Sequence, residues 1–230
     1  MKIGTLKESS LHRSLKTRYS DSEIETQIGD YVCDGKRSDG ELIEVQTGSF
    51  GPLKEKVKSL CKKNKVRIIH PIIIQKTIEL FDTEGRLLRK RKSPKKGCAF
   101  DLFKALVYAP ELPLTKNLSI ELAHIDVIEK RIDDGTGSWR RKGVRISDRF
   151  LGSWHHSVLL KSTKDYLKFI PFRKNRCFTA KDFGSEAGIG PDLARKTLYV
   201  LVKMGLVEKT GKQGRAIIYK KSKTDNTSNF

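Results

Sequence analysis

Hydrophobic positions repeat along this chain with two periods, one typical of helices and one typical of strands. Between residues 52 and 64, Leu53, Val57 and Leu60 recur at helical spacing and lysines fill the other faces, which predicts an amphipathic helix. Residues 66–74 are dense in β-branched side chains and predict a buried strand. The other expected elements are helices over 10–19 and 100–108, a helical stretch after Ser147 that contains His155 and His156, and strands over 24–28, 31–34, 41–47, 77–81, 86–89 and 118–128.

A separate pattern fills residues 178–220. Thr179 is placed to cap a short helix, Pro191 starts a second helix and Gly205 ends it, and two short strands that flank a basic turn follow. This order of helix, turn, helix and basic hairpin resembles a winged helix-turn-helix domain. Such a domain is used for DNA binding, or else for protein contact or dimerisation. The resemblance implies DNA contacts through Arg195, Lys196, Tyr199, Lys203, Lys212 and Arg215.

The chain is therefore expected to divide into two folded parts. Residues 1–170 mix helices and strands, and residues 178–220 form the small domain. Residues 171–177 begin with a proline followed by basic residues and are predicted to be a linker. The polar segment 221–230 is predicted to be disordered.

The charge of the chain narrows the class of partner. Its 230 residues include 47 Lys and Arg against 27 Asp and Glu, a formal net charge of +20, so the protein attracts polyanions and nucleic acid is the expected partner. A ribosome-associated or membrane-surface protein would share this composition. No apolar run is long enough for a membrane span or a signal peptide, and the four cysteines lie far apart without a Cys-x-x-Cys pair. These features predict a soluble, cytoplasmic protein with reduced thiols and no small-molecule organic cofactor.

Candidate chemistry lies in a hairpin predicted around Asp39 and Gly40. A two-residue loop would set Asp34 across from Val45, whereas a three-residue loop with a left-handed Gly40 would set Asp34 across from Glu44 on the same face. Two carboxylates so placed repel each other unless a divalent cation, bound by carboxylate and main-chain carbonyl oxygens, neutralises them. The alternative is that Glu44 lies on an exposed edge and Asp34 only starts a turn. The helix and buried strand that follow favour a place near the centre of the sheet.

These residues resemble the PD-(D/E)xK nuclease superfamily. Asp34, nine intervening residues and Glu44-Val45-Gln46 stand in a helix, strand, strand, strand, helix, strand order within residues 1–130. The resemblance implies an α/β, restriction-endonuclease-like fold, a mixed β-sheet core flanked by helices, to which the small α+β winged-helix domain is added. It also implies that Asp34 and Glu44 bind Mg²⁺ or Mn²⁺ with help from the Val45 carbonyl. Glu8 would be the acidic residue that members often carry on the first helix.

One position departs from the family pattern. Gln46 stands where members usually carry a lysine that orients or deprotonates the attacking water, and glutamine can only form hydrogen bonds. Active members with Gln at this place occur. His12 and Lys16 are the candidates to supply the missing proton acceptor or positive charge. Glu25 is a further acidic candidate, and its alternative role is that of a solvated strand residue.

Basic stretches supply candidate phosphate contacts. Residues 86–97 carry seven positive charges and no acid, which is typical of a solvated loop or of a flap that contacts phosphates. Trp139 stands beside basic residues in a Gly-rich loop, where it can stack on a base or fill a hydrophobic gap. The expected DNA-binding residues of this part are Arg89, Lys90, Arg91, Lys92, Lys95, Lys96, Trp139, Arg140 and Arg141.

The sequence thus predicts a metal-dependent DNA endonuclease that is targeted by a winged-helix module. The alternative is a catalytically silent nuclease-fold protein that binds DNA or regulates transcription. The presence of two carboxylates that repel each other favours the enzyme. A double-strand cut by one active site per chain makes a homodimer an expectation. The predicted catalytic residues are Asp34, Glu44, Gln46, Glu8 and His12.

Overall fold

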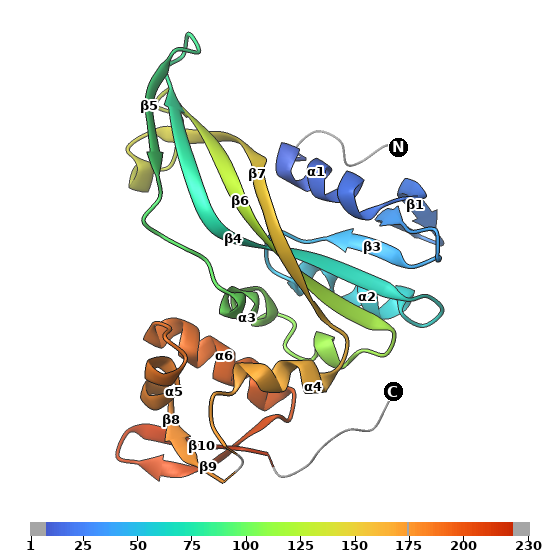
Figure 1. Ribbon diagram of the computed structural model, residues 1–230, viewed down its shortest axis with the longest axis vertical. Coiled ribbons are helices and arrows are strands. Elements are labelled where there is room, and N and C mark those ends of the chain that lie inside the picture. Colours follow the sequence, from blue (N-terminus) through green and yellow to red (C-terminus); the bar gives the residue numbers. More distant parts are fainter. Residues whose placement is uncertain (1–7, 174, 223–230) are drawn as a thin grey trace.

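The computed structural model describes residues 8–173 and 175–222. Its main feature is a seven-stranded mixed sheet with the order β1-β2-β3-β4-β6-β7, in which β5 pairs with the far half of β4 (Figure 1). The fold is therefore of the mixed α/β class. The strands are β1 (Glu23–Ile28), β2 (Tyr31–Lys36), β3 (Leu42–Val45), β4 (Val66–Phe81), β5 (Leu87–Lys92), β6 (Leu118–Asp133) and β7 (Val144–Leu160).

The strand directions follow from the connections. β1, β2 and β3 are joined as antiparallel neighbours, whereas β3 is parallel to β4 and β4 is parallel to β6. Parallel neighbours need a crossover connection. The helix α2 (Lys54–Leu60) lies in the first crossover and the helix α3 (Leu102–Leu106) lies in the second. β7 then returns antiparallel along β6.

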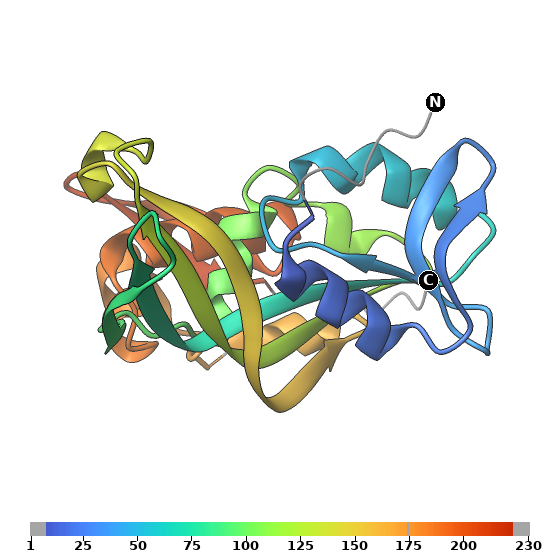
Figure 2. The same ribbon diagram turned by 90° about the horizontal axis from the view of Figure 1, so that it is seen from above.

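Helices cover the two faces of the sheet. On one face, Leu11 and Leu15 of α1 (Ser10–Tyr19) are buried against a cluster that includes Ile43 and Ile125. On the other face α2 and α3 pack into a second, larger core, so that α1 and α2 lie on opposite sides of the sheet (Figure 2). β4, β6 and β7 continue past α1 as a long arm, and β5 is attached to this arm (Figure 1). Among the described residues, no helix is both long and apolar enough to cross a membrane.

The C-terminal unit is built from two helices and a small sheet. Its elements are β8 (Cys177–Thr179), α5 (Ala180–Glu186), α6 (Pro191–Lys203), β9 (Val207–Gln213) and β10 (Ala216–Lys221). The three strands form an antiparallel sheet with the order β8-β10-β9. Thr179 caps α5 as predicted, because its hydroxyl accepts a hydrogen bond from the Asp182 amide while the Asp182 carboxylate accepts one from the Thr179 amide.

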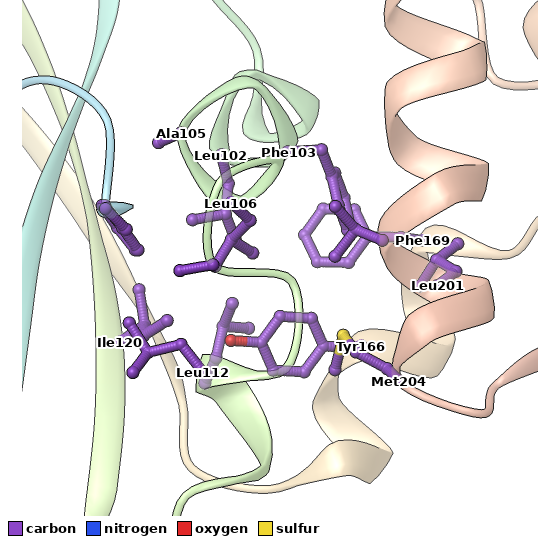
Figure 3. Close-up of a cluster of buried hydrophobic side chains, with 14 of the residues drawn as sticks. Leu102, Phe103, Ala105, Leu106, Leu112, Ile120, Tyr166, Phe169, Leu201 and Met204 are labelled. Atoms are coloured by element: carbon purple, nitrogen blue, oxygen red, sulfur yellow. The ribbon is translucent and has the colours of Figure 1, made fainter. Parts of the chain in front are cut away.

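The two parts of the chain share one hydrophobic core. Phe103 of α3 and Phe169 lie on the side of Leu201 of α6, and Leu106 lies toward Ile120 and Leu112, while Met204, just after α6, lies beside Tyr166 (Figure 3). The main sheet contributes to the same cluster from its other side. The C-terminal unit is therefore packed against the main sheet through buried apolar side chains, and the short helix α4 (Thr163–Tyr166) adds Tyr166 to the contact.

The connecting segment 171–177 takes part in this core. Phe172 is buried and stacks on Phe178 with a ring separation of 4.2 Å, and Cys177 already belongs to β8. A free linker would leave such an aromatic side chain in water, so the prediction of a simple linker is wrong for Phe172. The predicted tail also starts too early, because Lys221 belongs to β10. Residues 223–230 lie outside the described part of the chain.

The element predictions hold for most of the main sheet and fail for β7. The residues after Ser147, with His155 and His156, are a strand instead of a helix. The predicted strands 66–74 and 77–81 are a single strand, β4, with a register shift between Ile73 and Gln75. Such an irregularity places an extra residue in one strand and bends it locally.

Candidate functional site

The hairpin of β2 and β3 has the three-residue loop of the sequence prediction. The Arg37 amide donates to the Glu41 carbonyl at 2.9 Å, and Gly40 has a φ of +83°, the left-handed conformation that glycine adopts without strain. The register then pairs Gly35 with Ile43 and would bring Asp34 across from Glu44. The ladder stops one pair before these two acids. They therefore flank the point where β2 and β3 separate.

The Asp34 carboxylate closes the gap between the separating strands. Its Oδ2 accepts a hydrogen bond from the Val45 amide at 2.7 Å. The Asp34 side chain thus replaces the main-chain carbonyl that β2 would offer to β3 in a continuous ladder. The Lys16 ammonium lies 3.3 Å from Oδ1, and His12 Nε2 lies 3.4 Å from Oδ2. Burial alone would raise the pKa of Asp34, but the hydrogen bonds from His12 and Val45 hold it below its usual value. Asp34 is therefore an ionised carboxylate on the α1 side of the sheet.

His12 occupies the middle of this oxygen cluster. Its Nδ1 donates to Glu8 Oε1 at 2.5 Å and its Nε2 donates to the Val45 carbonyl at 2.8 Å. A carbonyl oxygen and an ionised carboxylate are both acceptors, so both ring nitrogens carry protons. Burial lowers the pKa of His12, but the contacts with Asp34 and Glu8 outweigh this effect and raise it to about 9. His12 is therefore an imidazolium at neutral pH.

Lys16 is a second cation in the same cluster. Its ammonium lies 3.0 Å from Glu8 and 3.2 Å from Glu25, in addition to its contact with Asp34. Burial would lower the pKa of Lys16, yet its acidic neighbours raise it to about 12. Burial would raise the pKa of Glu8, and the hydrogen bonds from His12 and Lys16 lower it. Three acids thus surround the two cations of α1, so the acids outnumber the cations by one. Glu8 lies two residues before α1, so its predicted place on the first helix is wrong.

Glu44 has a different environment. Its side chain is 3% exposed and lies beside Cys33 and the α2 face of the sheet. The Lys56 ammonium of α2 lies 2.5 Å from Oε1, but the angles of this contact are those of an ion pair and not of a directed hydrogen bond. Burial raises the pKa of Glu44, Lys56 opposes this effect, and the negative charge of Asp34 adds to it. Glu44 is the carboxylate of this site that is least well satisfied by the protein itself.

Gln46 does not join the cluster. Its side-chain amide donates to the Ser49 carbonyl at 2.5 Å and so braces the turn after β3. The main chain of Gln46 is held on both sides, since its amide donates to Ile69 and its carbonyl accepts from His70 Nδ1 at 2.7 Å. In this structure Gln46 positions the end of β3.

A divalent cation fits the donor types of the site. Asp34, Glu44 and the Val45 carbonyl offer hard oxygen atoms from two strands that separate at this point, and one oxygen of Glu44 is buried without a directed hydrogen bond. The described residues contain no group of three or more His, Cys, Asp or Glu side chains arranged to hold a metal ion. Asp34 and the Val45 carbonyl lie with His12 on the α1 side of the sheet, whereas Glu44 lies beside Cys33 and Lys56 on the α2 side. The prediction that Asp34 and Glu44 share one face is therefore wrong, and they approach each other only where β2 and β3 separate. The Val45 carbonyl also accepts a hydrogen bond from His12 Nε2.

Lys56 is the residue of the site that the sequence did not single out. It belongs to the lysine-rich surface of α2, next to the buried Val57, and nothing in its spacing distinguishes it from Lys54 or Lys58. Only the crossover of α2 over the sheet brings its ammonium to Glu44 and to the Val32 carbonyl at 2.6 Å. Its position supplies a positive charge beside the acids, as the lysine that is missing at position 46 would.

A cavity of about 410 Å³ opens beside the end of β3. Thr47, Gly48 and Ser49 form one wall, and the lysines Lys76, Lys95 and Lys104 contribute positive charge to the lining. Lys95 was among the predicted phosphate contacts, whereas Lys76 and Lys104 come from β4 and α3 and were not. The cavity adjoins the turn that Gln46 braces.

The remaining predicted DNA-binding residues are spread over two surfaces. Arg89, Lys90, Arg91 and Lys92 are exposed on β5, Lys96 is exposed after it, and Trp139 is 83% exposed at the start of the turn that holds Arg140 and Arg141. Arg195, Tyr199 and Lys203 are exposed on α6, while Lys196 pairs with Asp192 at 2.7 Å. Lys212 on β9 and Arg215 in the following turn are also exposed. The cluster of acids lies on neither surface.

The chain belongs to the family described as Domain of unknown function (DUF8091), which matches residues 9–161. This range contains the main sheet and the residues of the site from His12 to Lys56, whereas Glu8 lies just before it. A protein of Treponema pallidum (strain Nichols), described as uncharacterized, is 29% identical over 223 residues, which cover 96% of this chain and 88% of the relative. The likeness to that protein therefore extends into the C-terminal unit. No solved structure matches the chain.

Proposed function

We propose that this protein is a metal-dependent endonuclease that hydrolyses phosphodiester bonds in DNA. The observation that carries the proposal is the set of oxygens around His12. Glu8 just before α1, Asp34 from β2 and the Val45 carbonyl from β3 converge on one positive charge. A position that binds a cation through carboxylate and carbonyl oxygens has the donor types that Mg²⁺ and Mn²⁺ prefer.

The order of elements supports the same proposal. α1, β1, β2, β3, α2 and β4 follow one another in the helix, strand, strand, strand, helix, strand order of the PD-(D/E)xK nucleases. Asp34 and Glu44 stand at the end of the β2–β3 hairpin, where the motif of that superfamily stands. This combination of order and motif supports the restriction-endonuclease-like fold that we propose for the core.

In the proposed mechanism Asp34 and the Val45 carbonyl would hold the metal from the α1 side, and Glu44 would complete its ligands from the α2 side where β2 and β3 separate. When bound, the ion polarises the scissile phosphate and lowers the pKa of a water molecule. Lys16, with a pKa of about 12, stays positive and offsets the charge that develops on the phosphate. His12, with a pKa of about 9, is protonated at neutral pH, so it would act as a cation or as a proton donor to the leaving oxygen and not as the proton acceptor. Lys56 takes the place of the missing lysine of the motif.

The C-terminal unit is the proposed winged-helix module. α5 and α6 are joined by a tight turn, and the hairpin of β9 and β10 extends beside them. Arg195 and Lys203 on the exposed face of α6 and Lys212 on β9 would contact phosphates. The net charge of +20 gives DNA a strong long-range attraction to the whole molecule.

A nicking assay tests the catalytic proposal. Supercoiled plasmid, branched duplexes and single-stranded DNA are incubated with the protein in Mg²⁺, Mn²⁺ or chelator. We expect metal-dependent cleavage of at least one substrate, and a loss of about 100-fold or more in Asp34→Asn and in Glu44→Gln, as when a group that stabilises the transition state is removed. Asp39→Asn removes a carboxylate from the exposed loop of the same hairpin and should cut like the wild type. Absence of cutting, or full activity in both site variants, overturns the proposal.

A second candidate function is DNA binding without catalysis. Each acid of the site already has a cation of the protein beside it, and Gln46 has replaced the usual lysine of the motif. Such a site would be stable without metal. DNA binding by a wild-type protein that cuts none of the substrates, together with no change in melting temperature on addition of Mn²⁺, would establish this candidate in place of the enzyme.

A further inference from the structure

A cavity of about 220 Å³ on the long arm of the sheet is lined by five arginines. Their side chains surround an apolar floor made by Ile78, Leu80 and Val144. The arm lies at the opposite end of the sheet from the β2–β3 hairpin (Figures 1 and 2). The cavity is therefore separate from the candidate catalytic cluster. The arginines are Arg89, Arg91, Arg131, Arg140 and Arg141.

The register of the strands explains why three of these arginines share a face. Arg89 lies across from Leu80, Arg91 lies across from Ile78, and Arg131 lies on the other side of Leu80. Paired residues in a sheet point to the same face. Lys90 points to the opposite face, where it meets Glu79 at 2.9 Å. The strand β5 thus sends its arginines to the cavity and its lysines away from it.

The turn between β6 and β7 brings the other two arginines. Arg141 donates to the Val144 carbonyl at 3.1 Å, and Gly137 donates its amide to the Gly143 carbonyl at 2.6 Å. A side chain at position 137 would come within 2.0 Å of the Val144 oxygen, so only glycine allows this turn to close. Arg140 and Arg141 are therefore held over the strands by a defined turn.

Charge in the cavity is poorly balanced. Within the described part of the chain, an acid pairs with Arg131 but with none of the other four arginines. That acid is Glu129, which is fully buried and also binds Lys76 and Arg149. Arginine stays charged at all physiological pH values. Guanidinium groups that converge with so little counter-charge repel one another, which favours binding of a small anion with several oxygens.

We propose that the cavity binds the terminal phosphomonoester of a nucleic-acid strand, an inference that rests on the proposed binding of nucleic acid. A terminal phosphate carries about −1.5 to −2 charges and three free oxygens. An internal diester carries a single charge and continues on both sides, so it suits a long groove better than a small cavity in which several guanidinium groups converge. Trp139 is 83% exposed beside Arg140 and offers a face on which the last base can stack.

Binding measurements in chelator test this inference without cleavage. The probes are short duplexes with a 5′-phosphate, a 3′-phosphate or hydroxyls at both ends, labelled at an internal position and followed by fluorescence anisotropy. We expect wild type to bind one phosphorylated end about tenfold more tightly than the hydroxyl end. Arg89→Gln with Arg91→Gln should bring the two affinities to within about twofold.

Lys90→Gln with Lys92→Gln is the matched control. It removes the same charge from the same exposed strand on the opposite face, so it should lower all affinities alike and keep the preference for the phosphorylated end. Equal affinity of wild type for all three probes, or a preference that survives in the arginine variant, overturns the pocket but leaves the binding of DNA intact. Absence of any DNA binding overturns both. Inorganic phosphate and a mononucleotide are then added as competitors. If both abolish the preference equally well, the cavity binds free phosphate, and the proposal of a nucleic-acid end is overturned.

Discussion

Lys56 and Glu44 illustrate how single residues hold the candidate site together. Glu44 is almost completely buried, and an ionised carboxylate in such a place is costly unless a cation or several donors accompany it. Asp34 has an amide and two cations as partners, whereas Glu44 depends on Lys56. The two acids of the motif therefore respond differently to the loss of a neighbour.

We predict that Lys56→Met destabilises the protein by about 3 kcal/mol, because it leaves a buried carboxylate without its counter-charge. Methionine keeps most of the aliphatic volume, so lost packing contributes little. The free energy of unfolding in urea at neutral pH measures the effect. Lys58→Met removes an exposed lysine from the same helix and should change it little.

The double variant Lys56→Met with Glu44→Gln separates charge from packing. Removing both charges should recover most of the lost stability, since a neutral amide is cheaper to bury than a carboxylate. No recovery in the double variant would mean that the Lys56 side chain acts by its shape. The charge argument for Glu44 would then be wrong.

At the scale of elements, the sequence was sufficient where local chemistry decides the structure. The turn at Asp39 and Gly40, the β-branched run of β4 and the cap at Thr179 are local signals, and they predicted the hairpin, the central strand and α5. The location of Asp34 and Glu44 at one end of a hairpin followed from these signals. Their separate partners on α1 and α2 did not, because those contacts depend on which face each helix covers.

β7 shows why one element was misassigned. Most of its residues are partly or fully exposed, and several polar residues follow one another, so the alternation typical of a half-buried strand is absent. Pairing with β6 along its whole length stabilises the strand instead. Register shifts at three places further disturb the period of two. A long-range partner decided this element, and a single sequence does not show it.

Glu129 joins β4, β6 and β7 at the base of the arm. Its carboxylate, which is fully buried, lies 2.6 Å from Arg131, 2.9 Å from Arg149 and 3.2 Å from Lys76, and Arg91 lies one strand further on. Burial alone would raise its pKa, but the hydrogen bonds from Arg131 and Arg149 lower it to about 2. The ordinary value is 4.5, so the folded state favours the charged form.

We predict an acid-sensitive contribution of Glu129 to stability. A lowered pKa in the folded state stabilises the protein above pH 4.5, and this stability is lost as the pH falls from 4.5 toward 2. Wild type should exceed Glu129→Gln by about 3 kcal/mol at pH 7 and by little near pH 2. Urea unfolding across this pH range measures the difference. Glu84→Gln, an exposed acid, controls for the loss of one negative charge, and a difference that does not vary with pH contradicts the assignment.

At the scale of the whole molecule, the buried contact between α3 and α6 fixes the C-terminal unit against the main sheet. This contact could not be predicted from the sequence, because the apolar side chains of each helix could equally be buried inside its own unit. Because the C-terminal unit is held in place, the fold itself determines how the basic surfaces lie relative to one another. The exposed face of α6, β5 and the lysines of α2 are then separate surfaces of one body with a net charge of +20.

Salt dependence distinguishes direct phosphate contacts from the general attraction of this charge. Each phosphate neutralised by a Lys or Arg side chain contributes about 0.9 to the slope of log affinity against log salt. We predict that Arg195→Gln with Lys203→Gln on α6 lowers the slope by about 2 and weakens binding of duplex DNA. Lys62→Gln with Lys63→Gln removes the same charge from exposed residues after α2 and should leave the slope nearly unchanged. If both variants lower the slope by the same amount, the charge acts diffusely. If the α6 variant leaves the slope unchanged, its exposed face is assigned to protein contact.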